Sequence, residues 1–206
     1  MKTLRLGISC VGLSTIALTF AVGCTDNEDT SLVCSLEESM DDLGDQAARV
    51  ANYCNVPGSR GALKWYRVSA SVPGTDDVVQ LELWEGKGAF TGTRIHTGTF
   101  TIEGPEANLD DCGVCLRALG GKGTSDEREY FAISGTVEVT ALGGDGETIT
   151  ATVRDVTFAQ EADPSHACDA TLAHLTVGGT IVAKGMGGGG GGGGGGGNNC
   201  PLIIGD

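Results

Sequence analysis

Apolar and polar residues alternate over most of the chain between Leu63 and Lys184. A period of two places every second side chain on one face of an extended strand, whereas an amphipathic helix needs a period near 3.6. The pattern therefore restricts this region to β-strands with one apolar face each. The clearest runs are Tyr66, Val68, Ala70 and Val72, then Phe131, Ile133, Gly135, Val137, Val139 and Ala141, and finally Leu175, Val177, Gly179 and Ile181.

Turn signals divide this region into seven or eight strands. Strands that are apolar on one face only must bury that face, and two sheets packed together do so. We predict an antiparallel β-sandwich over residues 59–184, with a closed β-barrel as the alternative. Val156 and Phe158 are out of phase with the preceding residues, which predicts a bulge near Asp155. The turn signals are Pro73-Gly74, Gly120-Gly121, Gly143-Gly144-Asp145-Gly146 and Asp163-Pro164.

One hairpin is specific enough to predict its register. If Val72 lies opposite Asp77, the apolar residues of both strands share the core face. On the other face, Arg67 then meets Glu82, and Trp65 meets Trp84. Paired aromatic rings with polar neighbours are a common platform for sugars, so these four residues form a candidate ligand site. The favoured alternative is that the apolar stripe Leu36–Cys54 docks on this face and covers the rings, because exposed apolar patches are usually small.

Residues 34–58 have a different pattern. Their apolar residues recur at spacings of three and four, which predicts an amphipathic helix docked on the sheet. Ser35 and Glu38 fit a capping box, and Pro57-Gly58 ends the run. The stripe consists of Leu36, Met40, Leu43, Ala47, Val50 and Cys54.

The N-terminal residues have the form of a secretory leader. Lys2 and Arg5 precede an uncharged, largely apolar run from Leu6 to Val22. Ala21-Val22-Gly23-Cys24 resembles the lipobox of bacterial lipoproteins, although Leu is commonest where Ala21 stands. The resemblance implies a diacylglyceryl thioether on Cys24, removal of residues 1–23, and a polar tether over residues 24–33. The alternative is a soluble secreted protein cut at the same bond.

A second resemblance rests on several short motifs. The region from Trp65 to about Ile181 resembles a set of uncharacterised lipoproteins that are frequent in myxobacteria. It implies export and a β-rich domain, and it brings no known activity. The motifs are Leu81-Glu82-Leu83-Trp84, Gly88-Ala89-Phe90-Thr91-Gly92, Thr97-Gly98-Thr99-Phe100-Thr101-Ile102, Cys112-Gly113-Val114-Cys115, Ser134-Gly135-Thr136-Val137 and Val156-Thr157-Phe158.

Six cysteines follow Cys24, an even number that predicts three disulfides in an oxidising compartment. A continuous helix would hold Cys34 and Cys54 too far apart to bond, whereas a chain that turns back at Gly44 would let them pair directly. In an extended strand Cys112 and Cys115 would also lie too far apart, so we predict bridges from this pair to Cys168 and another cysteine. A redox-active or zinc-binding CxxC is the alternative. The six are Cys34, Cys54, Cys112, Cys115, Cys168 and Cys200.

The formal net charge of −14 disfavours binding to nucleic acid or to anionic headgroups. No catalytic motif, metal-ligand spacing or cofactor motif is present, and the glycine-rich residues 185–206 are predicted to be disordered. We therefore expect a non-catalytic structural or binding module, lipid-anchored in the bacterial envelope as an outer-membrane or surface lipoprotein. Its expected partner is a glycan or an envelope protein. The alternatives are a carbohydrate-binding module and a secreted thiol-disulfide protein.

Overall fold

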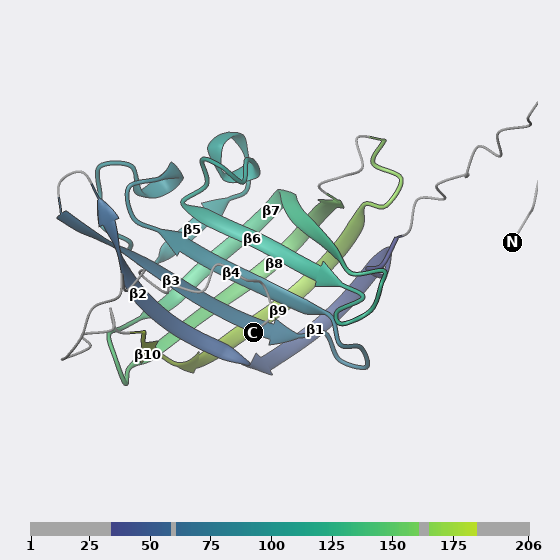
Figure 1. Ribbon diagram of the computed structural model, residues 1–206, viewed down its shortest axis with the longest axis horizontal. Helices are drawn as coiled ribbons and strands as arrows, with labels where there is room; N and C mark the ends of the chain where they lie inside the picture. The colour runs from purple at the N-terminus through teal and green to yellow at the C-terminus, as the bar shows by residue number, and fades with distance from the viewer. Residues whose placement is uncertain (1–33, 59–60, 161–164, 185–206) are drawn as a thin grey trace, which may run out of the picture. The chain divides into compact units, whose positions relative to one another are not determined.

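The computed structural model describes residues 34–58, 61–160 and 165–184, which form a mainly β fold (Figure 1). These residues include two short 3-10 segments, η1 (Gly88–Phe90) and η2 (Gly104–Ala107), and no α-helix. The strands are β1 (Ser39–Ala47), β2 (Val50–Gly58), β3 (Gly61–Ser71), β4 (Val78–Trp84), β5 (Gly98–Thr101), β6 (Val114–Gly120), β7 (Arg128–Leu142), β8 (Thr148–Gln160), β9 (Ala170–Thr180) and β10 (Val182–Ala183).

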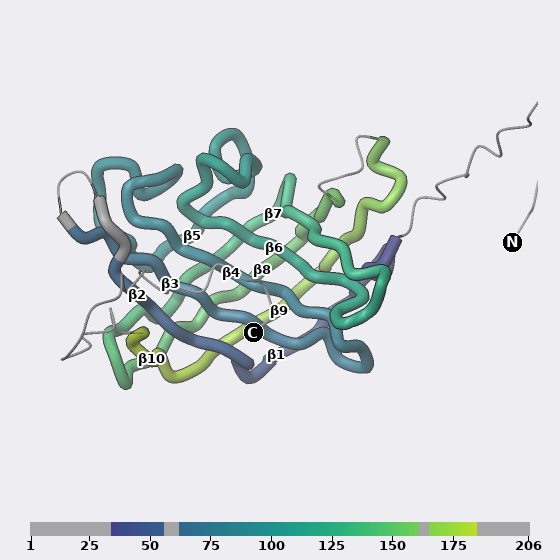
Figure 2. The backbone as a smooth tube through the Cα atoms, viewed as in Figure 1, coloured from purple at the N-terminus to yellow at the C-terminus, as the bar shows by residue number. Residues whose placement is uncertain are grey.

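All ten strands belong to one mixed sheet that curls into a half-barrel. The order is β1-β9-β8-β7-β6-β4-β3-β2-β10, with β5 paired to β7. The β1–β9 and β10–β2 pairs are parallel, and every other pair is antiparallel. The chain passes directly from β1 to β2 and from β9 to β10, so it crosses twice between the two ends of the strand order (Figure 2).

The predicted two-sheet sandwich is wrong, because the ladder of strand pairs is continuous from one end of the order to the other. Alternation reports which face of each strand is buried, and it does not report whether neighbouring strands belong to one sheet or two. A strongly curled sheet can bury its concave face against itself, as two packed sheets do. The mainly β class is confirmed.

The predicted helix over residues 34–58 is also wrong, because this segment forms β1 and β2. A bulge explains the three-residue step from Met40 to Leu43, and the other such step, from Ala47 to Val50, spans the connection between β1 and β2. The β1–β9 register shifts between Asp42 and Asp45, and Gly44 has a φ of +63°. An extra residue moves the following apolar side chains out of phase, so spacings of three and four arise in an extended chain.

The predictions about individual strands and about the pairing within one hairpin are confirmed. The β3–β4 pairing places Trp65 opposite Trp84 and Arg67 opposite Glu82, as predicted. The long strand through Gly135 is β7. The bulge is at Asp155, whose φ is +51°, where the β7–β8 register shifts between Ser134 and Thr136.

The concave face of the sheet is a packed apolar core. Burying a side chain of this kind stabilises the fold by about 1.5 to 3 kcal/mol. Large members with under 2 % of their surface exposed include Phe90, Ile102, Leu116, Tyr130, Ile149, Phe158, Leu172 and Leu175.

The parallel β1–β9 pair carries a side-chain link as well. His174 Nδ1 lies 2.6 Å from Asp42 Oδ1, and this hydrogen bond, with a smaller one from the Gly44 N–H, lowers the pKa of the exposed Asp42 carboxyl below its ordinary value of 3.8. A lowered carboxyl pKa stabilises the fold at neutral pH, and this contribution is lost as the pH falls below 3.8 through the folded-state pKa.

No helix in the described ranges is long and apolar enough to span a bilayer.

Candidate functional site on the outer face of the sheet

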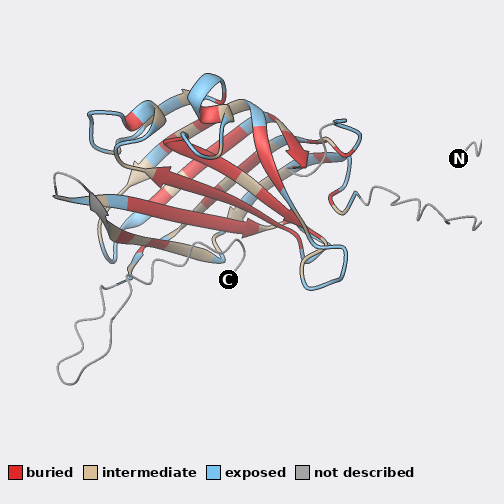
Figure 3. Cartoon of the chain, turned by 45° about the horizontal axis from the view of Figure 1, so that its top comes forward, coloured by how far each residue is buried: buried red, intermediate tan, exposed pale blue. Residues whose placement is uncertain are grey.

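The sheet also has an unusual outer face, on the side of β2, β3, β4 and β6 that points away from the core. β4 is buried on both faces over six of its seven residues, and Figure 3 shows strands that are buried along most of their length. The strand register aligns the outer side chains in rows across the sheet. We call these residues the outer face: Asn52, Cys54, Trp65, Arg67, Ser69, Gln80, Glu82, Trp84, Cys115 and Arg117.

The two tryptophans lie side by side on this face. Their ring centroids are 5.2 Å apart with the planes tilted by 39°. Trp65 has no exposed surface, and Trp84 is half-buried. A sugar platform needs both ring faces open to solvent, so the burial of Trp65 does not favour the carbohydrate hypothesis, which stays a prediction.

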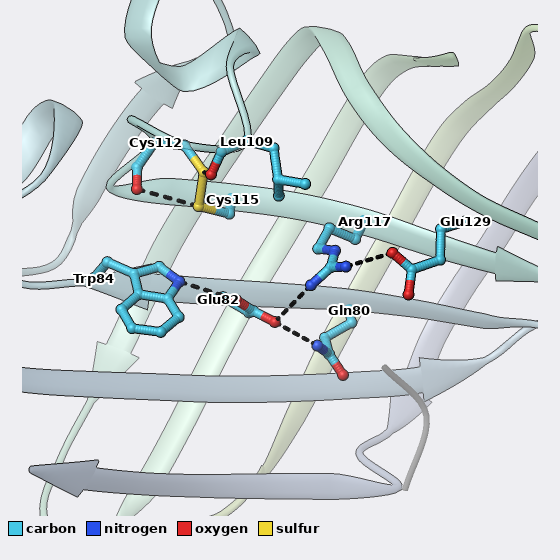
Figure 4. Close-up of polar contacts among 8 residues, drawn as sticks. All are labelled: Gln80, Glu82, Trp84, Leu109, Cys112, Cys115, Arg117 and Glu129. Carbon is cyan, nitrogen blue, oxygen red and sulfur yellow. Dashed lines mark hydrogen bonds and ion pairs between the residues drawn. A yellow bond between two sulfur atoms is a disulfide. The ribbon is translucent and has the colours of Figure 1, made fainter. Parts of the chain in front are cut away.

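Glu82 is the centre of a polar network on the outer face (Figure 4). Its carboxylate accepts hydrogen bonds from Gln80 Nε2 at 2.6 Å and Trp84 Nε1 at 2.9 Å. Its ion pair is with Arg117 Nη1 at 3.6 Å. Arg67 lies opposite Glu82 in the ladder and has its guanidinium 5.8 Å from the Trp65 ring centre.

Arg117 was missed in the sequence, where only Arg67 was considered as the cation beside Glu82. It lies on β6, which has no clear alternation because six of its seven residues are buried. Arg117 also donates from Nη2 to Glu129 at 2.6 Å. It therefore links the nearly buried carboxylate of Glu82 to the half-exposed one of Glu129.

Replacement of Arg117 by methionine is expected to lower the free energy of unfolding by about 1 to 3 kcal/mol, because it removes the cation of the ion pair with the buried Glu82 carboxylate. Urea unfolding of the purified protein measures this. The control Glu129→Gln, at the exposed end of the network, should cost less than about 1 kcal/mol. Adding Glu82→Gln to the Arg117 variant should recover part of the loss. An equal loss in the Arg117 and Glu129 variants would contradict this assignment.

The CxxC segment differs from the prediction. Cys112 and Cys115 bond to each other, with their Cα atoms 5.3 Å apart. The extended geometry expected for this segment does not apply, because β6 begins at Val114 and Cys112 lies in the preceding turn, where its N–H donates to the Asn108 carbonyl. Both cysteines are at least 98 % buried. A reactive CxxC needs an accessible sulfur, so this burial favours a structural bridge over a redox site.

A second disulfide joins Cys34 to Cys168, across 134 residues of chain. The predicted bridge from the CxxC pair to Cys168 is therefore wrong. Cys54 is also disulfide-bonded, and its partner is none of the four cysteines in these two bonds. Cys24 and Cys200 lie outside the described residues.

Other groups of polar residues have structural roles in the part of the chain that the structure describes. Asp77 is buried and accepts a hydrogen bond from the Gly121 N–H at 2.8 Å, which links the β3–β4 connection to the β6–β7 connection. His166 contacts Asp169, and His174 contacts Asp42. No group of three or more His, Cys, Asp or Glu among these residues is arranged to hold a metal ion.

A shallow pocket of about 230 Å³ lies near one end of β3. Lys64 and Arg94 bring positive charge to it, and Glu85 brings a carboxylate that accepts the Lys64 N–H at 2.7 Å. The Tyr66 hydroxyl, also at its wall, donates to the Gly143 carbonyl. The pocket therefore has mixed charge, with two of its polar groups bonded within the protein.

Comparisons with protein-family models, with curated proteins and with solved structures found no match.

Proposed function

We propose that this chain is an exported lipoprotein, anchored through Cys24, whose half-barrel is a non-catalytic structural or binding module at the surface of a bacterial envelope. The leader and the lipobox-like Ala21-Val22-Gly23-Cys24 support the export route. The observation that carries the proposal is the disulfide content of the half-barrel, because disulfides form and persist outside the reducing cytoplasm.

A structural or binding role is supported by how the polar groups are used. The buried charged groups form hydrogen bonds or ion pairs within the protein, as Glu82, Asp77 and Glu106 do. Arg117, which pairs with Glu82, is partly accessible. Catalytic acids and bases need access to a substrate and a pKa suited to proton transfer. The thiol-disulfide alternative has no comparable support, since both sulfurs of Cys112–Cys115 are buried.

The lipid anchor can be tested on the N-terminal peptide of the mature protein. The full-length chain, expressed with its leader in a Gram-negative host, should partition into the detergent phase of a Triton X-114 extraction. Trypsin after reduction should release residues 24–49 carrying the mass of a diacylglyceryl group and an amide-linked acyl chain. Three acyl chains give stable anchoring where one is marginal.

The matched variants are Cys24→Ala and Cys10→Ala. The first should move the protein to the aqueous phase without changing the fold of the half-barrel, and the second should behave as wild type. A mature chain that begins at an unmodified Cys24 and stays in the aqueous phase would identify a soluble secreted protein instead.

A further inference from the structure

The burial of the outer face is not explained by the elements that surround it. Asn52, Ser69 and Gln80 are each at most 1 % exposed. All strands of the described ranges form one sheet, so they supply no second layer over this face. The turn that contains Leu109 and Cys112 reaches only the Trp84 end. The outer face of a single sheet would otherwise meet solvent, so the described elements do not account for this burial.

Cys54 lies on this face, directly opposite Trp65 in the β2–β3 ladder. It is disulfide-bonded, and the two bonds between described cysteines use Cys34, Cys168, Cys112 and Cys115. Its partner is therefore one of the cysteines outside the described residues. The inference rests on the proposed function here: if Cys10 is removed with the leader and Cys24 carries the lipid, Cys200 is left.

The path of the chain is consistent with this partner. β10 pairs in parallel with β2, and the Lys184 N–H donates to the Tyr53 carbonyl at 2.8 Å, so the chain leaves the sheet next to Cys54. Eleven consecutive glycines, Gly187 to Gly197, then precede Asn198. A glycine-rich tether of this length has a root-mean-square span of about 20 to 25 Å and closes on itself at little entropic cost.

We propose that Cys54 and Cys200 form a third disulfide and that residues 198–206 lie across the outer face as its cover. Pro201-Leu202-Ile203-Ile204 supplies apolar side chains for Trp65, and the backbone of the segment offers donors and acceptors. Trp65 Nε1, Ser69 Oγ and Gln80 Oε1 are buried without a hydrogen-bond partner and need such groups. In forming the bond, the two thiols give two protons and two electrons to the disulfide of an envelope oxidant protein, which becomes a dithiol.

Disulfide mapping tests the covalent part. Trypsin without reduction should release residues 50–60 joined to residues 185–206 as one species, and reduction should separate them. A Cys54 peptide joined to the Cys24 peptide, a chain linked to a second copy on a non-reducing gel, or a free Cys54 thiol would each overturn the proposal.

Acrylamide quenching of tryptophan fluorescence tests the cover. The protein has two tryptophans, and only Trp84 has exposed surface. Cys200→Ser should raise the quenching constant about twofold, because both rings rather than one would then meet the quencher. The control Asn198→Ser, two residues from the cysteine, should quench as wild type. An unchanged constant in Cys200→Ser, with near-UV circular dichroism confirming a native fold, would show that residues 198–206 do not shield Trp65.

Discussion

Serine at both Cys34 and Cys168 is expected to lower the free energy of unfolding by about 4 to 5 kcal/mol, the largest effect of any change considered. The bond spans 134 residues, so its loss releases the unfolded chain from a very long closed loop. It also joins the segments that lead into β1 and β9, with their Cα atoms 5.1 Å apart. Because β1 is at one end of the strand order and pairs with β9 alone among the described strands, this bond holds a terminal strand in place.

Urea unfolding of the mature protein, followed by circular dichroism, measures this loss. The matched control is serine at both Cys112 and Cys115, which removes a bond between residues only three apart. The same chain-entropy reasoning gives that short loop about 2 kcal/mol or less. Equal losses in the two double variants, or a loss below about 1 kcal/mol for Cys34 and Cys168, would contradict the proposed role of the long loop.

Features fixed by residues close together in the sequence were predicted correctly, and features fixed by pairing between distant strands were not. The β3–β4 hairpin was predicted to the residue because one short turn and one apolar face fix its register. The Asp155 bulge was predictable because a phase slip is visible within a single strand. In both cases the deciding features lie within one hairpin or one strand.

β1 could not be predicted in the same way. Its partner, β9, is about 130 residues away, and the pair is parallel, so no local turn indicates it. The bulge at Gly44 also produced one of the three-residue steps that imitate a helical spacing. The difference between one curled sheet and two packed sheets is likewise decided by long-range strand pairing, which alternation does not record.

In the candidate site, too, the residues of one hairpin were predicted and those from more distant strands were not. Trp65, Trp84, Arg67 and Glu82 were placed together correctly by the hairpin register. Arg117, the cation that pairs with Glu82, comes from β6, beyond the hairpin. The Cys112–Cys115 bond was missed because the prediction assumed an extended strand where the chain turns before β6.

Glu106 was also missed, although a large effect is expected from its replacement. It lies on η2 with 6 % of its surface exposed, and its carboxylate accepts three backbone hydrogen bonds. Oε1 accepts the Ala89 N–H, and Oε2 accepts the N–H groups of Gly113 at 2.9 Å and Val114 at 2.6 Å. One side chain therefore joins η1, η2 and the start of β6, beside the Cys112–Cys115 bond.

Glu106→Ala should lower the free energy of unfolding by about 3 kcal/mol, because it leaves two buried N–H groups and one partly buried N–H group without an acceptor. Glu106→Gln retains one acceptor oxygen but turns an amide donor toward other donors, so its loss should be intermediate. The control is Glu103→Ala on the same segment, where the side chain is exposed and makes no capping hydrogen bond. This control should change stability by less than about 0.5 kcal/mol. Amide hydrogen exchange should locate the effect, with faster exchange at Gly113 and Val114 in Glu106→Ala. Unchanged exchange at both amides, together with wild-type stability, would mean that the carboxylate does not organise this junction.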